Sequence, residues 1–463
     1  LPKFIRRTID QVNPKGIMDV DAEVLWPGKA GRAVDVNVNL TGRDGEFSYV
    51  GFPYKVEKVS GRLVMEGPDL ILAEFKGRHG DTLVEVGLKN IEREGTPWRQ
   101  ITVRGTNGTI DVDLRNALGP DARALWEVLK PAGGLDVVYV RQHQRKPWRT
   151  DIYRVSTDVL LNDVTVQLGE PVLIQSGKVT VAELLPTDEG TAYQGSASVG
   201  ALTTRDMTAT EIKLRFEGGE QSGRLMLQNI EGGFYDGVLS GHISLPSIGA
   251  VKEQPGFEGV VTLTDADAAA VAAANGYDEI AGRLDVTAAF TGEIGADEPV
   301  NCSGALTIRE GEIGQLPGML ALLNVVRLYG LDSPAFHSVE LAYELKEGDF
   351  IAHSLSLRGE SLTLVGKGVL HEDDSYDFRF RPELVGEGGL PTVGPVINSL
   401  KDFLMPVTLK GTVEEPVWDV DLPLDVRQVL PQAIEAFNPL RLLRLAPLPR
   451  PKPATDAAEP NEE

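Results

Sequence analysis

The chain has 463 residues, enough for two or three ordinary domains or for one extended array of repeats. Its 45 Lys and Arg against 68 Asp and Glu give a formal net charge of −23, which repels phosphate backbones and argues against nucleic-acid binding as a main role. The single cysteine, Cys302, excludes an intrachain disulfide and an all-thiolate metal site. The 50 Gly and 29 Pro punctuate short aliphatic segments and favour a chain dominated by β-strands.

Strict alternation of apolar and polar residues recurs along the chain and predicts strands with one apolar face. Residues 34–40 alternate without exception, with four aliphatic side chains on one face. Turns that contain Gly, Asp or Asn, such as 347–349 and 373–375, separate the strands about every ten residues, as in antiparallel meanders. The same alternation predicts further strands at 110–114, 212–216, 284–288, 339–343 and 376–380.

Roughly two dozen strands follow one another with few helices, more than a closed sandwich holds. The sequence therefore predicts a mainly β fold, an elongated, curled antiparallel β-sheet that forms a groove, with a few short capping helices. At ~4.8 Å per strand, about 25 strands would make a groove of ~120 Å. The aliphatic residues expected to line this groove are Val34, Val36, Val38, Leu40, Leu284, Val286, Leu362 and Leu364.

Helices are predicted at 121–130, 265–275, 316–329, 393–403 and 425–437. The third is apolar on nearly every face, with only Asn324 and Arg327 strongly polar. It either plugs one end of the sheet as a core helix or contacts lipid as a lid. In the first case Arg327 needs a carboxylate such as Glu340 or Glu344, and in the second it reaches a phosphate.

The predicted organisation has four parts: β-groove units over 1–250, a C-terminal domain over 251–424 that contains the helix 316–329, an amphipathic segment over 425–445, and a disordered Pro-rich acidic tail over 446–463. No apolar run approaches the roughly 18 to 20 residues that span a bilayer. Lipid or membrane contact is expected instead from two apolar segments that carry arginines; the residues are Leu316, Met319, Leu320, Leu323, Arg327, Arg441, Leu442, Leu443 and Arg444.

The sequence carries no motif that points to catalysis, a metal or a cofactor. The six histidines include no pair at helical ligand spacing. Asp373 and Asp374 resemble an acid/base pair, but their place beside Ser375 between two strands favours a turn. Gly366 and Gly368 favour a bend or a close backbone approach. The basic run 141–149 is either a solvated loop or a contact for anionic lipid headgroups.

Several segments resemble the AsmA-like family, which includes the TamB-type proteins of the bacterial envelope. The likeness is carried by 51–63, by 232–241, above all by 304–318 running through the apolar helix to 364–370, and by 409–418. It covers about 13–424. The resemblance implies a periplasmic β-rich body, held in the inner membrane by an N-terminal helix. The chain starts at Leu1 without such a helix, so we expect that anchor to lie outside this sequence.

The resemblance further implies a protein whose hydrophobic groove carries phospholipid acyl chains between the inner and outer membranes. We expect it to be non-enzymatic, because no catalytic motif is present, and the net charge argues against nucleic acid as a partner. The alternative is a structural or assembly factor of the envelope whose sheet holds no ligand. A β-helical enzyme that acts on polysaccharide is disfavoured, because no carboxylate cluster recurs on one face.

Overall fold

The computed structural model describes residues 13–25, 28, 35–42, 45–66, 69–144, 153–168, 170–187, 190–205, 207–219, 223–247, 256–274, 280–294, 300–311, 336–360, 362–373, 375–384, 407–412 and 416–420. The fold is mainly β, an antiparallel sheet that is not closed, with few short helices, as the alternation predicts. The chain divides into two compact units. The N-terminal unit comprises 1–205, 209–230 and 244–255, and the C-terminal unit comprises 206–208, 231–243 and 256–463.

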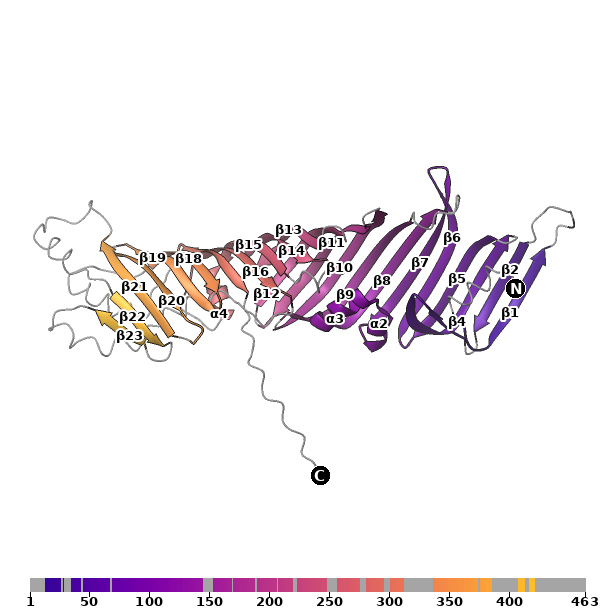
Figure 1. Cartoon of the computed structure of the whole chain (residues 1–463), viewed down its shortest axis with the longest axis horizontal. Helices are drawn as coiled ribbons and strands as arrows, with labels where there is room; N and C mark the ends of the chain where they lie inside the picture. The colour runs from indigo at the N-terminus through magenta and orange to yellow at the C-terminus, as the bar shows by residue number, and fades with distance from the viewer. Residues whose placement is uncertain are drawn as a thin grey trace, which may run out of the picture. The chain divides into compact units, whose positions relative to one another are not determined.

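Strands that follow one another in the chain pair antiparallel in the N-terminal unit. The order runs from β1 through β2 and β4 to β11, while the short β3 pairs with the first half of β4 (Figure 1). The strands are β1 (Met18–Leu25), β2 (Asp35–Gly42), β3 (Glu46–Tyr49), β4 (Phe52–Glu66), β5 (Asp69–His79), β6 (Thr82–Arg93), β7 (Thr96–Thr109), β8 (Ala132–Gln144), β9 (Tyr153–Leu168), β10 (Glu170–Thr187) and β11 (Gly190–Thr204).

The same meander builds the C-terminal unit, where β15 to β23 pair in chain order. The remaining strands are β12 (Met207–Gly219), β13 (Arg224–Phe234), β14 (Gly237–Pro246), β15 (Gly256–Asp267), β16 (Arg283–Glu293), β17 (Asn301–Arg309), β18 (Phe336–Lys346), β19 (Asp349–Gly359), β20 (Leu362–Leu370), β21 (Ser375–Leu384), β22 (Val407–Thr412) and β23 (Pro416–Val420).

Two of the expected helices lie in the described ranges. The helix predicted at 121–130 is α3 (Pro120–Leu129). The one predicted at 265–275 begins later, as α4 (Ala268–Ala274), because residues 265–267 complete β15. The Asp267 carboxylate accepts hydrogen bonds from the backbone N–H groups of Ala269 (2.8 Å) and Ala270 (3.3 Å) and so caps this helix. The other three predicted helices lie outside the described residues.

The strand predicted at 110–114 is wrong. Residues in this segment begin the helix α2 (Val112–Ala117), which lies against β4. The Asp111 carboxylate accepts a hydrogen bond from the Leu114 backbone N–H at 2.8 Å, and Asp113 adds a negative charge in the first turn. This N-terminal cap stabilises a helix locally, and it outweighs the alternation of apolar and polar residues.

Long strands in both units are bent by a residue in the left-handed conformation. Seven such residues lie inside described strands, with φ between 49° and 59°: Lys58, Asn107, Asp163, Ser176, Glu211, Asn229 and Asp265. The ladder of backbone pairs is interrupted at several of them, as between Gly105 and Gly108 in β7 and between Leu263 and Ala266 in β15. Bulges of this kind increase the local twist and bend a strand, which fits the curl of the sheet.

Each bulge also shifts the alternation by one residue. Val56 and Val59 would face opposite sides of an unbroken β4, yet both lie beside Gly77, where an added Cβ would be 2.6 Å from Val56 and 3.2 Å from Val59. In β10, an added Cβ on Gly177 would lie 3.1 Å from both Ile174 and Leu161. The bulges therefore keep the two apolar halves of each strand on one face of the sheet.

Candidate functional site

The candidate site is the apolar face of the sheet, which the strand register builds from rows of side chains that run across the strands. In the N-terminal unit, one row joins cross-strand partners in the order Val84, Gly105, Val137, Val159, Val179 and Ala197. The next row runs through Val86, Val103, Tyr139, Thr157, Val181 and Gly195. Neighbouring rows of small aliphatic side chains give a continuous apolar strip across six strands.

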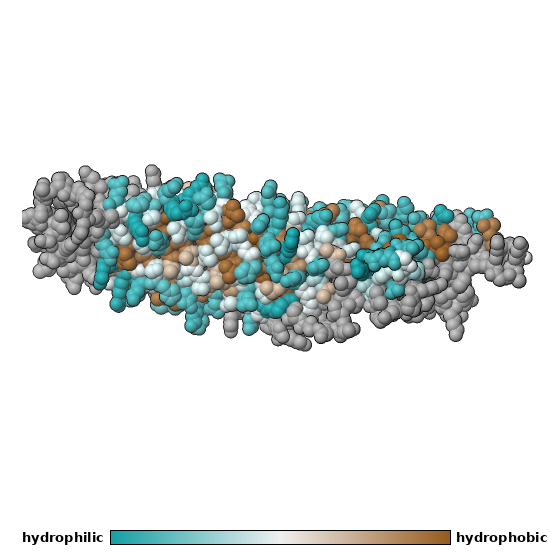
Figure 2. Space-filling model, turned by 90° about the horizontal axis from the view of Figure 1, so that it is seen from above, coloured by the Kyte–Doolittle hydropathy of each residue, from teal (hydrophilic) through white to brown (hydrophobic). Residues whose placement is uncertain are grey.

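This strip is only partly covered. Val86, Val103, Val137 and Val159 are half-buried, and the buried cluster around Val56, Val59 and Val84 is small. Figure 2 shows brown, hydrophobic side chains bordered by teal, hydrophilic ones, as a long band over the C-terminal unit and as shorter patches over the N-terminal unit. Valine side chains that keep part of their surface in contact with water remain available for another apolar group.

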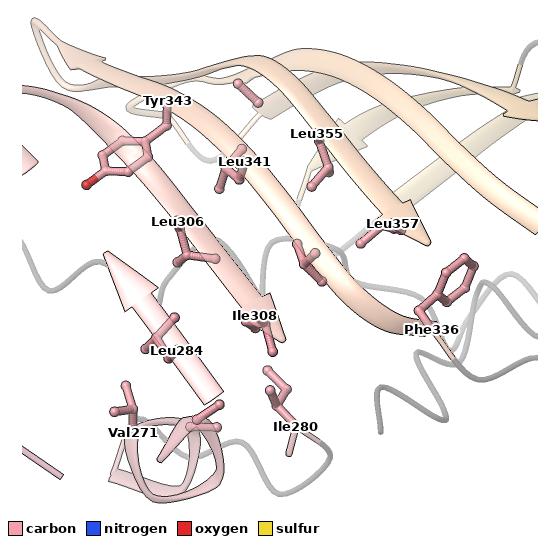
Figure 3. Packing of buried hydrophobic residues seen from close by; sticks show 14 of the residues in the cluster. Val271, Ile280, Leu284, Leu306, Ile308, Phe336, Leu341, Tyr343, Leu355 and Leu357 are labelled. Carbon is pink, nitrogen blue, oxygen red and sulfur yellow. The ribbon is translucent and has the colours of Figure 1, made fainter. Parts of the chain in front are cut away.

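The C-terminal unit repeats the rows with larger side chains and buries them. One row joins Leu284, Ile308, Val339, Leu357 and Leu364, and the next joins Val286, Leu306, Leu341 and Leu355. Figure 3 shows several of these side chains together with Val271 of α4 and Ile280, which lie beside Leu284 and Ile308. Phe336, Phe378 and Ile308 are at most 1% exposed. Here the apolar face is a filled core.

Aromatic rings lie over glycines on this face. Gly366 and Gly368 are the cross-strand partners of Phe380 and Phe378, and a Cβ added to either glycine would lie 2.5 Å from the ring. Gly259 and Gly292 lie in the same way under Phe290 and Phe257, with 2.6 Å to an added Cβ. The prediction of a close approach at Gly366 and Gly368 is confirmed, and the approaching group is a ring as well as backbone.

The opposite face of the C-terminal unit is polar and carries ion pairs across strands. Arg309 donates to Asp285 at 2.8 Å, Arg358 lies 3.3 Å from Glu340, and the His353 ring lies 2.9 Å from Glu344. Burial alone would raise the pKa of Asp285, but the hydrogen bonds from Arg309 and from the Asp265 backbone N–H lower it below its usual value. The charges therefore lie on the side away from the apolar rows.

Of the residues expected to line a groove, three belong to the apolar rows of the C-terminal unit. Leu284 and Leu364 are 2% and 3% exposed, and Val286 packs against the same cluster. Leu362 begins β20, two residues before Leu364. In β2, Val36, Val38 and Leu40 alternate opposite Met65, Leu63 and Gly61. Val34 lies outside the described residues.

The residues expected to touch lipid or membrane also lie outside the described ranges. They are Leu316, Met319, Leu320, Leu323, Arg327, Arg441, Leu442, Leu443 and Arg444. Within the described part, Glu340 and Glu344, the carboxylates considered for Arg327, pair with Arg358 and His353. Along that part, no helix is long and apolar enough to cross a membrane.

The polar side chains with unusual environments have structural explanations. Asp373 accepts hydrogen bonds from the Ser375 hydroxyl (2.5 Å) and backbone N–H (3.0 Å), and these bonds lower its pKa, as expected of a turn. Burial raises the pKa of both Cys302 and Tyr343, which face each other in the C-terminal core. In the ranges described, no three His, Cys, Asp or Glu side chains are grouped so that they could hold a metal ion.

The sequence analysis considered the basic run 141–149 as a solvated loop or a headgroup contact, but it did not place the start of this run on the apolar face of a strand. Arg141 and His143 end β8 within the basic run 141–149, and Arg99 of β7 is the cross-strand partner of His143. The signal was present, because Tyr139, Arg141 and His143 continue the alternation of Leu135 and Val137. Extending that strand past Val140 would have placed the arginine and the histidine beside the valines.

Comparison with known proteins identifies no relative: no protein-family model, curated protein or solved structure matches the chain. The function of the chain is therefore inferred from the apolar rows and the polar side chains beside them.

Proposed function

We propose that this protein binds lipids without catalysing a reaction, and that the apolar rows of its sheet hold the acyl chains as phospholipid moves between two membranes. An envelope role, in the periplasm between inner and outer membranes, follows from the resemblance to AsmA-like proteins. The observation that carries the proposal is the half-buried strip of the N-terminal unit, made of rows such as Val84 to Ala197 and Val86 to Gly195.

The strip has the dimensions and chemistry that an acyl chain needs. Six strands, β6 to β11, span ~24 Å at ~4.8 Å per strand. That length exceeds the extended length of a typical acyl chain. Each methylene that leaves water against valine contributes about 0.8 kcal/mol. A row across the strands therefore offers a path along which a chain slides without breaking a directional bond, because every neighbour along the row is aliphatic or glycine, apart from Tyr139 and Thr157.

The second candidate is a structural or assembly factor of the envelope that holds no ligand. The filled core of the C-terminal unit favours this alternative, since Ile308 and Phe378 are fully buried and leave no surface for a chain. The two candidates differ in what they predict for the N-terminal unit, whose half-buried strip is covered by lipid in one case and by nothing in the other.

Photo-crosslinking tests the proposal directly. A photoreactive phenylalanine analogue is placed at Val137, on the apolar strip, and in a matched variant at Val138, its neighbour on the opposite face of β8. We expect phospholipid adducts by mass spectrometry at position 137 and few at position 138. Equal labelling at both positions, or none at 137 in a protein purified without detergent, would contradict lipid binding on this face.

Lipid extraction supplies the second measurement. The natively purified chain should release phospholipid, and Val103→Asp should reduce the amount because a carboxylate on the strip disfavours an adjacent acyl chain. Thr102→Asp, one residue away on the other face of β7, is the control for the cost of placing a charge in this strand. A clean wild-type preparation would favour the structural factor.

A further inference from the structure

We propose that the apolar strip of the N-terminal unit selects phospholipids with a net negative headgroup, and that Arg141, with His143 and Arg99 beside it, holds that headgroup at the margin of the strip. This inference rests on the proposed lipid binding and adds the class of lipid. The observation that supports this inference is the position of these three side chains in strands, on the apolar face of the sheet. Side chains of a solvated loop would not lie on that face.

The register places the three side chains in order. On β8, Val137, Tyr139, Arg141 and His143 alternate on one face, so the strip passes from aliphatic to aromatic to cationic within one strand. Across the strands, Arg141 is the partner of Ile101 on one side and Val155 on the other. Arg141 therefore lies at the margin of the strip, beside the rows, and a phospholipid whose headgroup lies at this margin can place its acyl chain on the neighbouring valine rows.

Arg141 contacts two tyrosines and still leaves part of its hydrogen-bonding capacity unused. Tyr139 shares a side-chain hydrogen bond with it, and its guanidinium carbon lies 4.8 Å from the centre of the Tyr153 ring, within the range of a cation–π contact. Its Nε is buried, and within the described residues it has no hydrogen-bond partner. No ion pair joins Arg141 to a carboxylate of the described chain. A planar guanidinium without a carboxylate suits a phosphate ester, which accepts two parallel hydrogen bonds.

The surroundings also favour an anion. His143 faces Arg99 across the strands, and its pKa is lowered by burial and by the charges of Arg99 and Arg141. Arg99 donates to the Asn90 amide oxygen at 3.4 Å. Arg99 and Arg141 place two positive charges in one corner and disfavour a third on His143, so an anionic headgroup bound there would be attracted to both arginines. The chain as a whole carries −23 and repels anionic lipid, so the preference must come from this local group.

Tyrosine side chains lie on both sides of Arg141: Tyr139 belongs to the adjacent apolar row, and Tyr153 is the cross-strand partner of His143. Burial raises the pKa of Tyr139, Arg141 partly offsets that rise, and the neighbouring Tyr153 and Tyr49 add to it. Tyr49 belongs to the tip of the β3–β4 hairpin, so this tip lies close to the same part of the apolar face. Phenol rings with one apolar side and one hydroxyl suit the boundary between an acyl chain and a headgroup.

Calorimetric titration with two soluble short-chain lipids tests the inference. The full chain, freed of bound lipid, is titrated with phosphatidylglycerol and with phosphatidylcholine that carry the same acyl chains. We expect about tenfold tighter binding of phosphatidylglycerol, the range of one charge-assisted contact at a half-buried site, and loss of that preference in Arg141→Gln. Arg141→Lys should recover part of it, and Arg104→Gln, which removes the same charge from the opposite face of β7, should leave it unchanged.

Each outcome decides between the claims. Equal affinity of the wild-type chain for both lipids would overturn the headgroup inference and leave lipid binding standing. An equal loss in Arg141→Gln and Arg104→Gln would also overturn it, because only the total charge would then matter. No binding of either lipid would contradict the proposed function itself. Circular dichroism and thermal unfolding of each variant confirm that it is folded, and Arg141→Met, of similar length, replaces Arg141→Gln if the latter is not.

Discussion

Alternating apolar and polar residues give each of the two units one apolar face, but this face is partly open in the N-terminal unit and filled in the C-terminal unit. In the N-terminal unit the rows are mostly Val, Gly and Ala and remain largely half-buried, whereas in the C-terminal unit they are mostly Leu, with Ile and Val, and are buried almost completely. The described buried clusters have 3 members around Val56 and 22 around Ile308, so the difference is not marginal. Alternation decides which face is apolar, and side-chain volume decides whether that face is open or filled.

The filled face should depend strongly on its aromatic side chains. Phe378→Ala removes a ring that is 0% exposed and leaves a cavity, so we expect a loss of about 3 to 5 kcal/mol in the free energy of unfolding. Val365→Ala, at a 37% exposed position of the neighbouring strand, is the control and should cost less than about 1 kcal/mol. Denaturant unfolding followed by circular dichroism measures both. Similar small losses would show that the core is not close-packed.

Enlarging one side chain in each unit tests the comparison itself. Leu341→Phe inserts atoms into the filled core and should cost about 1 to 3 kcal/mol, whereas Val103→Phe adds a ring to a half-buried strip and should cost less than about 1 kcal/mol. The latter should also reduce the lipid recovered on purification, because the ring occupies the strip. If Val103→Phe destabilises the protein as much as Leu341→Phe, the N-terminal face is closed and the contrast is wrong.

Glycines under rings should tolerate a methyl group far less than glycines in open space. Gly368→Ala would press Cβ against the Phe378 ring, 2.5 Å away, and against the backbone of Asp377, so we expect a cost of about 1 to 3 kcal/mol. Gly87→Ala, where nothing lies within 4 Å of an added Cβ, should be neutral or stabilise by about 0.5 kcal/mol. Urea unfolding of the two variants compares them. Equal effects would mean that the ring moves aside freely.

At the left-handed residues of the bulges, we expect glycine to stabilise and a β-branched residue to destabilise, which is the reverse of the usual preference within a strand. Ser176 has φ 54°, so Ser176→Gly should stabilise by up to about 1 kcal/mol and Ser176→Val should destabilise by about 1 to 2 kcal/mol. At Lys178, an exposed position two residues along β10, glycine should instead cost about 0.5 to 1 kcal/mol and valine should be nearly neutral. Thermal unfolding of the four variants measures these differences. The same sign at both positions would contradict a bulge at Ser176.

These bulges mark the limit of what the sequence could provide. The alternation in 284–288, 339–343 and 376–380 correctly predicts β16, β18 and β21, because period two is a local property. A bulge breaks that period, so Leu161, Asn162, Asp163 and Val164 appear as a fault in the pattern although both apolar residues share a face. Two polar residues between aliphatic ones, with Asn, Asp or Ser second, are the signal that was available.

Whether an apolar face is open or filled was less predictable from the sequence than the positions of the strands. Leu284 and Leu364 were expected to line a groove beside Val36 and Val38, since nothing in one strand separates an open row from a filled one. Whether Leu284 meets solvent or Ile308 and α4 depends on partners that come from other parts of the chain. The prediction of a strand at 110–114 was wrong for a local reason. The Asp111 cap acts within three residues and outweighs the alternation.

The polar face of the C-terminal unit provides the smallest expected effect. The pKa of Asp285 is lowered in the folded state from its usual 3.8, so its contribution is present above that value and is lost as the pH falls through the lower, folded-state pKa. Because the pair with Arg309 is partly exposed, we expect a loss of less than about 1 kcal/mol on acidification below pH ~4. Asp285→Asn should remove that component, and added salt should weaken it in the wild type. An unchanged acid dependence of unfolding in Asp285→Asn would show that the ion pairs of the polar face contribute nothing, and that the apolar rows alone stabilise this unit.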